Sequence, residues 1–88
     1  MKIKSGFILR EIAGNYIVVS VGERVKEFNG VVNLNKTGVL LWNALIKGAT
    51  EEELVNALLS EYDVEKSVAE SDVLEFVNKL KEANLIKD

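Results

Sequence analysis

The sequence predicts an α+β fold in which a three-stranded antiparallel sheet comes first and a three-helix bundle follows. Up to about residue 35, β-branched residues dominate and the apolar runs are short; beyond it, apolar residues recur at helical spacing. The chain has only 88 residues and shows no internal repeat, so we expect one domain, residues 1–88. A small sheet on three helices resembles the winged helix-turn-helix arrangement, here with the sheet placed first.

Two strands are expected over 7–13 and 16–21, because both segments are short, apolar and rich in β-branched residues. The segment Ala13-Gly14-Asn15 is a turn signal between them, since Gly14 and Asn15 both tolerate positive φ. A third strand is expected over 26–34, where Gly30 marks a bulge, a turn or a close approach of another backbone. The apolar runs of the first two strands are nearly continuous, so the pattern does not decide which face is buried.

The first helix is expected to begin at Asn35, whose side chain can accept a backbone N–H of the first turn, and to end before Gly48. The alternative is that Asn35 or Thr37 contacts a ligand, but capping explains both residues. The apolar stripe of this helix is expected to comprise Val39, Leu41, Trp42, Leu45 and Ile46. We expect Trp42 to anchor the core rather than to stack on a ligand.

The second helix, over about 51–61, has the clearest start in the chain. Thr50 and Glu53 form a capping-box pattern, which explains the acidic cluster Glu51-Glu52-Glu53 better than a metal or acid–base site does. A third helix is expected over about 65–83 with Asn84 as its C-cap. Its apolar stripe comprises Val68, Val73, Phe76, Val77 and Leu80. Leu85-Ile86 should then fold back onto the core or pair as a short strand.

Composition excludes several classes of function. The chain has no cysteine and no histidine, which removes thiol chemistry, the usual general base and the commonest metal ligands. Its net charge of −3 argues against non-specific nucleic-acid binding. The longest apolar runs are too short to span a membrane, and the first six residues are not followed by an apolar stretch of signal-peptide length. We therefore expect a cytoplasmic protein that is not an enzyme and holds no cofactor or metal.

Residues 31–42 carry a more specific pattern, Val-Val-Asn-Leu-Asn-Lys-Thr-Gly-Val-Leu-Leu-Trp. It resembles the signature of the PqqD-like family, the pyrroloquinoline quinone synthesis protein D group. The link Gly48-Ala49-Thr50-Glu51-Glu52, the segment 58–62 and the segment 72–80 resemble later motifs of that family in the same order. The ordered resemblance covers about residues 6–86.

The resemblance implies a peptide-recognition element. Such a module binds the leader of a ribosomally made precursor peptide and presents it to a modifying enzyme, often a radical S-adenosylmethionine maturase. The leader would add as a strand to the edge of the third strand and lie against the third helix. The implied docking edge is Asn29, Gly30, Val31, Val32, Asn33 and Leu34, and the implied apolar wall is Val73, Phe76, Val77 and Leu80.

Several alternatives stay open at this level. The wall residues fit a plain core as well as a groove. Glu70, Asp72 and Glu75 form a solvated face or attract a basic leader. An exposed edge strand can pair with a second copy of the chain, giving a homodimer. A winged-helix DNA-binding regulator is the alternative function, although the second helix contains no basic residue.

Overall fold

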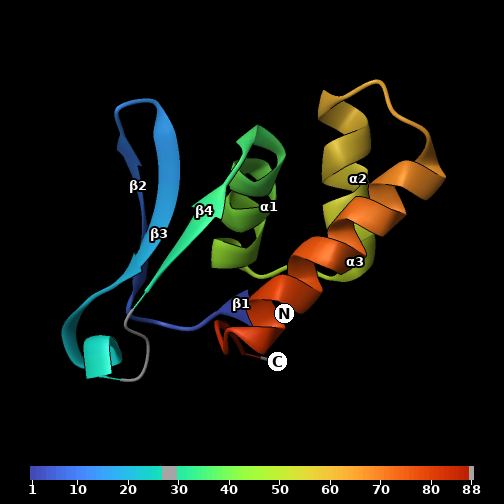
Figure 1. Cartoon of the computed structure of the whole chain (residues 1–88). Helices are drawn as coiled ribbons and strands as arrows, with labels where there is room; N and C mark the ends of the chain where they lie inside the picture. The colour runs from blue at the N-terminus through green and yellow to red at the C-terminus, as the bar shows by residue number, and fades with distance from the viewer. Residues whose placement is uncertain (27–29, 88) are drawn as a thin grey trace.

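The computed structural model describes residues 1–26 and 30–87. Its β2–β3 hairpin and β4 stand beside three helices (Figure 1). In chain order the elements are β1 (Lys2–Ile3), β2 (Phe7–Ile12), β3 (Asn15–Ser20), the 3₁₀ helix η1 (Gly22–Lys26), β4 (Val31–Leu34), α1 (Lys36–Lys47), α2 (Glu51–Glu61), α3 (Lys66–Glu82) and β5 (Ile86–Lys87). The predicted order of sheet then helices, and the α+β class, are confirmed.

The hairpin between β2 and β3 sets the register of the sheet. Its two-residue loop consists of Ala13 and Gly14, with φ of 52° and 82°, as a type I′ turn requires. Both residues belong to the expected turn signal, whereas its third residue, Asn15, already belongs to β3 and pairs with Ile12. The three strands are antiparallel in the order β2-β3-β4, with Val18 opposite Val32 and Tyr16 opposite Leu34.

The helix boundaries agree closely with the sequence predictions. Asn35 caps α1 by accepting the N–H of Gly38 at 2.8 Å. Thr50 and Glu53 form the complete capping box of α2, with bonds of 3.0 and 3.1 Å. At the end of α3, Asn84 follows the C-cap residue Ala83 and adopts φ 65°. The N–H groups of Asn84 and Leu85 then bond back into the last turn, which is the Schellman ending.

Three expectations need correction. The strand expected over 26–34 is shorter: β4 begins at Val31, whereas Lys26 ends the 3₁₀ helix η1. In α3 it is Ala69, not Val68, that faces the core; Val68 is 46% exposed. Similarly, Ile46 at the end of α1 is 44% exposed, because the core-facing stripe of that helix is completed by Leu45.

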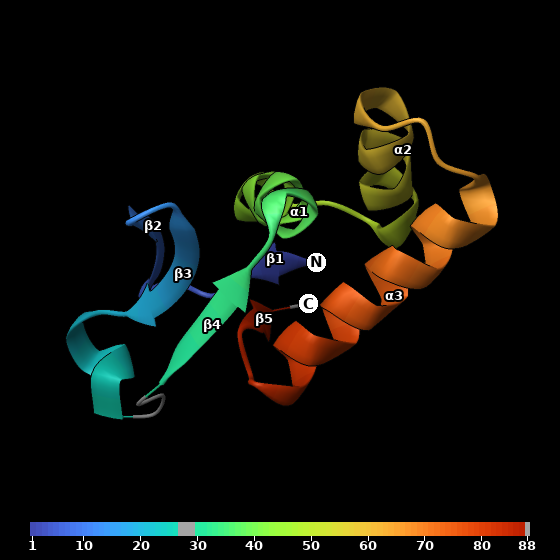
Figure 2. The same ribbon diagram turned by 45° about the horizontal axis from the view of Figure 1, so that its top comes forward.

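The two-stranded sheet of β1 and β5 was not predicted in full. Ile3 pairs with Ile86, and Lys4 donates its backbone N–H to Leu85 at 2.9 Å. The return of Leu85-Ile86 to the core is confirmed, since Leu85 is fully buried. This small sheet joins the two ends of the described chain between α1 and the C-terminal end of α3 (Figure 2).

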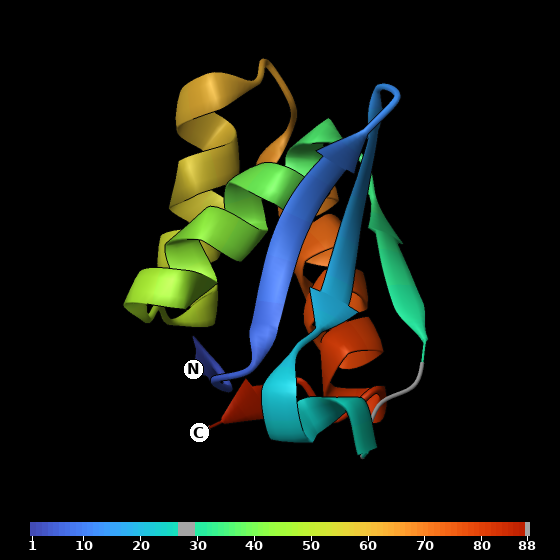
Figure 3. The ribbon, with the colours of Figure 1, turned by 90° about the vertical axis from the view of Figure 1, so that its left-hand side faces the viewer.

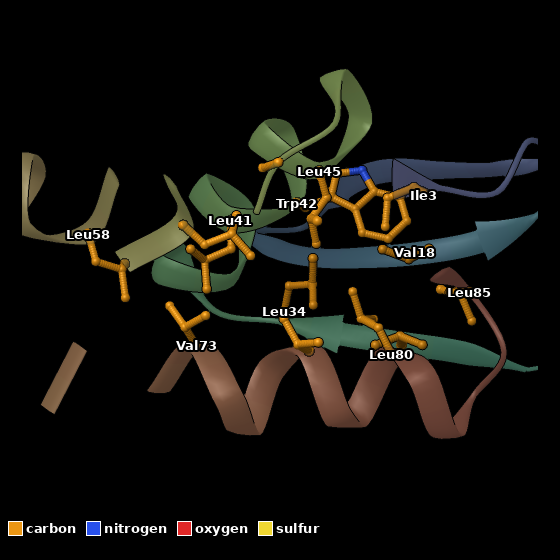
Figure 4. Close-up of a cluster of buried hydrophobic side chains, with 14 of the residues drawn as sticks. Ile3, Val18, Leu34, Leu41, Trp42, Leu45, Leu58, Val73, Leu80 and Leu85 are labelled. Atoms are coloured by element: carbon orange, nitrogen blue, oxygen red, sulfur yellow. The ribbon is translucent and has the colours of Figure 1, made fainter. Parts of the chain in front are cut away.

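The helices lie on one face of the three-stranded sheet, and the other face is open (Figure 3). The core between them gathers side chains from every layer, including Val18, Leu34, Trp42 and Leu80 (Figure 4). Trp42 is 2% exposed, which confirms its role as a core anchor. Among the described residues, no helix is long and apolar enough to cross a membrane.

Candidate functional site

Strand β4 forms the edge of the sheet nearest to α3 (Figure 2). In an antiparallel ladder, successive residues direct their backbone groups alternately to the two neighbouring strands. The tight turn makes Ile12 and Asn15 a hydrogen-bonded pair, so the odd-numbered residues of β3 face β2 and the even-numbered ones face β4. It follows that Val32 and Leu34 bond to β3, whereas Val31 and Asn33 direct their N–H and C=O groups outward.

A side chain from α3 occupies part of this edge. The Nζ of Lys79 donates a hydrogen bond to the carbonyl oxygen of Asn33 at 3.3 Å, across 46 positions of sequence. The bond is exposed to solvent. It independently places the Asn33 carbonyl on the outer side of β4, as the ladder alternation requires. Within the described part of the chain, no strand pairs with this side of β4.

A hollow of about 180 Å³ continues the edge beyond the end of β4. It lies between the first turns of α1 and the middle of α3, and its lining is mostly polar. Two carboxylates, Asp72 and Glu75, stand on its wall from α3, and Lys79 stands nearest to β4. The full lining is Asn35, Thr37, Leu41, Asp72, Glu75, Phe76 and Lys79.

Phe76 supplies the half-exposed apolar surface of the hollow. A Cβ added at Gly38 would lie 3.3 Å from the Cε1 of this ring and 3.2 Å from the capping oxygen of Asn35. Gly38 therefore lets α3 approach the start of α1 closely. The Thr-Gly pair of the sequence signature thus serves this junction: Thr37 donates its hydroxyl to Asn35 at 2.8 Å, and Gly38 makes room for Phe76.

The sequence matches the model of the family described as Coenzyme PQQ synthesis protein D (PqqD) over residues 15–86. This range includes β3, β4, all three helices and the first residue of β5. The chain belongs to the PqqD family.

Two solved structures share the fold of this PqqD-family chain. One is described as TbiB1 in complex with the TbiA(beta) leader peptide; it matches with a TM-score of 0.76 at 24% identity and covers 100% of both chains. The other is lasso peptide synthetase B1 complexed with the leader peptide, with a TM-score of 0.76 at 23% identity, covering 99% of this chain and 96% of that one. No curated protein sequence matches the chain significantly.

The residues predicted for the docking edge of this PqqD-family chain are placed as follows. Asn29 lies outside the described residues. Gly30 is exposed and immediately precedes β4. Val31 and Asn33 are exposed, whereas Val32 and Leu34 are buried at 7% and 9%. The expectation that Val31 and Val32 face opposite sides of the sheet is confirmed.

The predicted apolar wall divides in two. Val73, Val77 and Leu80 are at most 1% exposed and belong to the core. Phe76 alone of the four has accessible surface and contributes to the hollow. The wall that a docked peptide would meet is therefore narrower and more polar than the stripe suggested.

The acidic residues of α3 also separate. Asp72 and Glu75 line the hollow beside β4, but Glu70 lines a different hollow of about 550 Å³ between α2 and α3. Lys79 was not among the predicted site residues, because the sequence assigned it to the cationic end of the helix dipole. Its spacing from Phe76 (three residues, hence one side of the helix) is the signal that could have found it.

Replacing Asn35 by Ala is expected to destabilise the fold by about 1 kcal/mol, because the first turn of α1 loses its side-chain cap. It also removes the acceptor of the Thr37 hydroxyl at the mouth of the hollow. Chemical denaturation followed by circular dichroism measures the change. Asn35→Asp is the matched control and should stay within about 0.5 kcal/mol, since Asp caps as well as Asn. Equal stability of the Ala variant would contradict the capping role.

Proposed function

We propose that this chain is a non-catalytic peptide-recognition module. It captures the leader segment of a ribosomally made precursor peptide by strand addition and presents the peptide to a modifying enzyme. The observation that carries the proposal is the open side of β4, where Val31 and Asn33 direct backbone donors and acceptors toward α3. Strand addition uses such an edge, because backbone hydrogen bonds supply affinity and flanking pockets supply selectivity.

Membership of the PqqD family supports this function, as does the likeness of the fold to two proteins solved with leader peptides. The docked strand would extend the three-stranded sheet by one strand. Successive side chains of the docked strand would point alternately to the two faces of the sheet. One set would face the hollow beside Phe76, and the other set would lie on the open face near Val31. The proposed site comprises Asn29, Gly30, Val31, Val32, Asn33, Leu34, Val73, Phe76, Val77 and Leu80, with the buried members acting as its support.

The proposal also has finer parts, which the resemblance to the family and the length and composition of the chain suggest. The modifying partner is a radical S-adenosylmethionine maturase, the chain acts as one domain over residues 1–88, and it works in the cytoplasm. In the absence of a leader, the same edge is available to a second copy of the chain. The winged helix-turn-helix likeness adds no nucleic-acid function, since α2 contains Glu51, Glu52, Glu53 and Glu61 and no basic residue.

An NMR titration tests the function. ¹⁵N-labelled chain is titrated with a synthetic peptide of the leader encoded beside its gene. Binding by strand addition is expected to shift the amide signals of residues 30–34 and 73–80, with the largest changes at Val31 and Asn33, whose N–H groups face the docked strand. Leu9 and Glu11, which direct their N–H groups away from β3 at the opposite edge, serve as the internal control.

Saturating leader that shifts nothing in β4 would refute strand addition at this edge. Shifts of equal size at both sheet edges would also refute it, because they would indicate a non-specific change of the sheet. Duplex DNA added to the same sample measures the winged-helix alternative, and we expect no shift from it.

A further inference from the structure

Lys79 is a charged side chain in hydrogen-bond contact with the open edge of β4. Its ammonium group donates to the outward carbonyl of Asn33 at 3.3 Å in the free chain. That carbonyl is one of the two outward acceptors of β4, the other being that of Val31, and a strand that pairs along the whole of β4 bonds to both. Such a docking peptide therefore has to replace the ammonium group with one of its own backbone N–H groups.

Displacement leaves Lys79 without its acceptor. A long lysine side chain keeps its charge in solvent and can turn about several bonds, so the ammonium group remains beside the docked strand. The side chain of the docked residue that pairs with Asn33 points to the open face, as Asn33 itself does; the residues on either side of it point toward α3. A carboxylate at one of those two flanking positions lies within reach of Lys79.

The hollow has an uneven charge along its length. Lys79 lies beside β4, whereas Glu75 lies about one turn and Asp72 about two turns earlier on α3. A peptide carboxylate is attracted at the β4 end and repelled at the α1 end. Glu75 also competes for the displaced ammonium group, since it stands four residues before Lys79 on the same helix. Competition from Glu75 should keep the preference for an acidic peptide residue moderate. The uneven charge should restrict that preference to peptide positions at the β4 end of the hollow.

We propose that Lys79 is a specificity-determining residue: it covers the edge of β4 in the free chain and, when displaced, selects peptides that carry Asp or Glu one position from the residue paired with Asn33. The proposal rests on the proposed function, because it concerns the same edge. It adds the chemistry of the peptide that this edge prefers, an extended segment with one carboxylate at a set position.

The test uses a displayed library of random dodecapeptides, selected in parallel on the wild-type chain, Lys79→Met and Lys81→Met. Lys81 is the matched control, because it is an exposed lysine two residues further along α3 and therefore on the opposite side of the helix. Selection on the wild type and on Lys81→Met should enrich Asp or Glu at one position. Selection on Lys79→Met should show no such enrichment. Selection on Lys79→Glu should instead enrich Lys or Arg at the same peptide position.

A second measurement quantifies the pair. One selected peptide is compared with its Glu→Gln or Asp→Asn counterpart by isothermal titration. The amide peptide should bind the wild type about three- to tenfold more weakly, and the difference should shrink to less than about twofold with Lys79→Met. Raising the salt concentration should reduce the advantage of the acidic peptide. Thermal melts of the variants should match the wild type, because Lys79 is exposed.

The possible results separate the two proposals. Peptides that shift the Val31 and Asn33 signals but show no acidic position, or keep it with Lys79→Met, overturn the role of Lys79 and leave leader capture intact. Selected peptides that shift no residue of β4 overturn leader capture, and the role of Lys79 with it. Both proposals are supported if the acidic peptide binds more tightly than its amide counterpart only when Lys79 is present, and if it shifts the signals of β4.

Discussion

Replacing Asn33 by proline is expected to weaken leader binding by about thirtyfold or more, or roughly 2 kcal/mol, while the chain stays folded. The substitution removes the outward N–H of Asn33 and places a pyrrolidine ring where the docked strand must lie. The fold tolerates it because this N–H does not bond to β3, and proline is accepted on edge strands with its missing donor toward solvent. Fluorescence anisotropy with a labelled leader peptide measures the affinity.

Two control variants isolate the backbone contribution. Asn33→Ala removes the same side chain but keeps the N–H, so its affinity should stay within about threefold of the wild type. Glu11→Pro places the same ring at the opposite edge of the sheet, where the N–H also points away from β3, and should leave binding unchanged. If Asn33→Pro binds as tightly as Asn33→Ala, then the leader does not pair with β4.

The helices could be predicted from the sequence because their ends are set by local contacts. Asn35 bonds to a group three residues away, and Thr50 and Glu53 bond to each other. Such contacts depend on spacing alone, and spacing is visible in the sequence. For this reason α1 and α2 begin and end where the pattern placed them.

The small strands could not be predicted in the same way. Strand β1 has two residues, too few for an alternating pattern, and pairs with β5 more than 80 positions later in the chain. The beginning of β4 was placed too early because apolar and polar residues alternate poorly before it. What defines β4 is its pairing with β3, a contact between segments that only the folded chain brings together.

The candidate site could be predicted only in part, because the contacts between α3 and β4 form only in the folded chain. The family resemblance of residues 31–42 pointed to β4 as the candidate edge, but helical periodicity could not divide the α3 stripe into core and groove. Val73 and Val77 are buried in the core, whereas Phe76 between them is only partly buried and its ring lies close to Gly38 at the start of α1. Lys79 was missed since its reach to Asn33 depends on the crossing of α3 and β4.

Replacing Trp42 by alanine is expected to cost about 3–5 kcal/mol of unfolding free energy, the largest effect of any substitution considered. The indole is 2% exposed and extends among Ile3, Val18 and Leu45 at the centre of the core (Figure 4). A small domain has only about 5–10 kcal/mol of stability, so the variant should melt at least about 12 °C lower. Far-UV circular dichroism measures the melt, since Trp42 is the only tryptophan and fluorescence is lost with it.

Ile46→Ala on the same helix is the control for this prediction. Ile46 is 44% exposed, so its loss should cost less than about 1 kcal/mol. Because Leu34 of β4 and Leu80 of α3 belong to the same core as Trp42, partial unfolding of Trp42→Ala also removes the docking edge. A leader that binds only the folded chain should therefore raise the melting temperature of this variant. The contradicting result has two parts: the leader binds the wild type but not Asn33→Pro, and saturating leader leaves the melting temperature of Trp42→Ala unchanged. The edge would then form independently of this core.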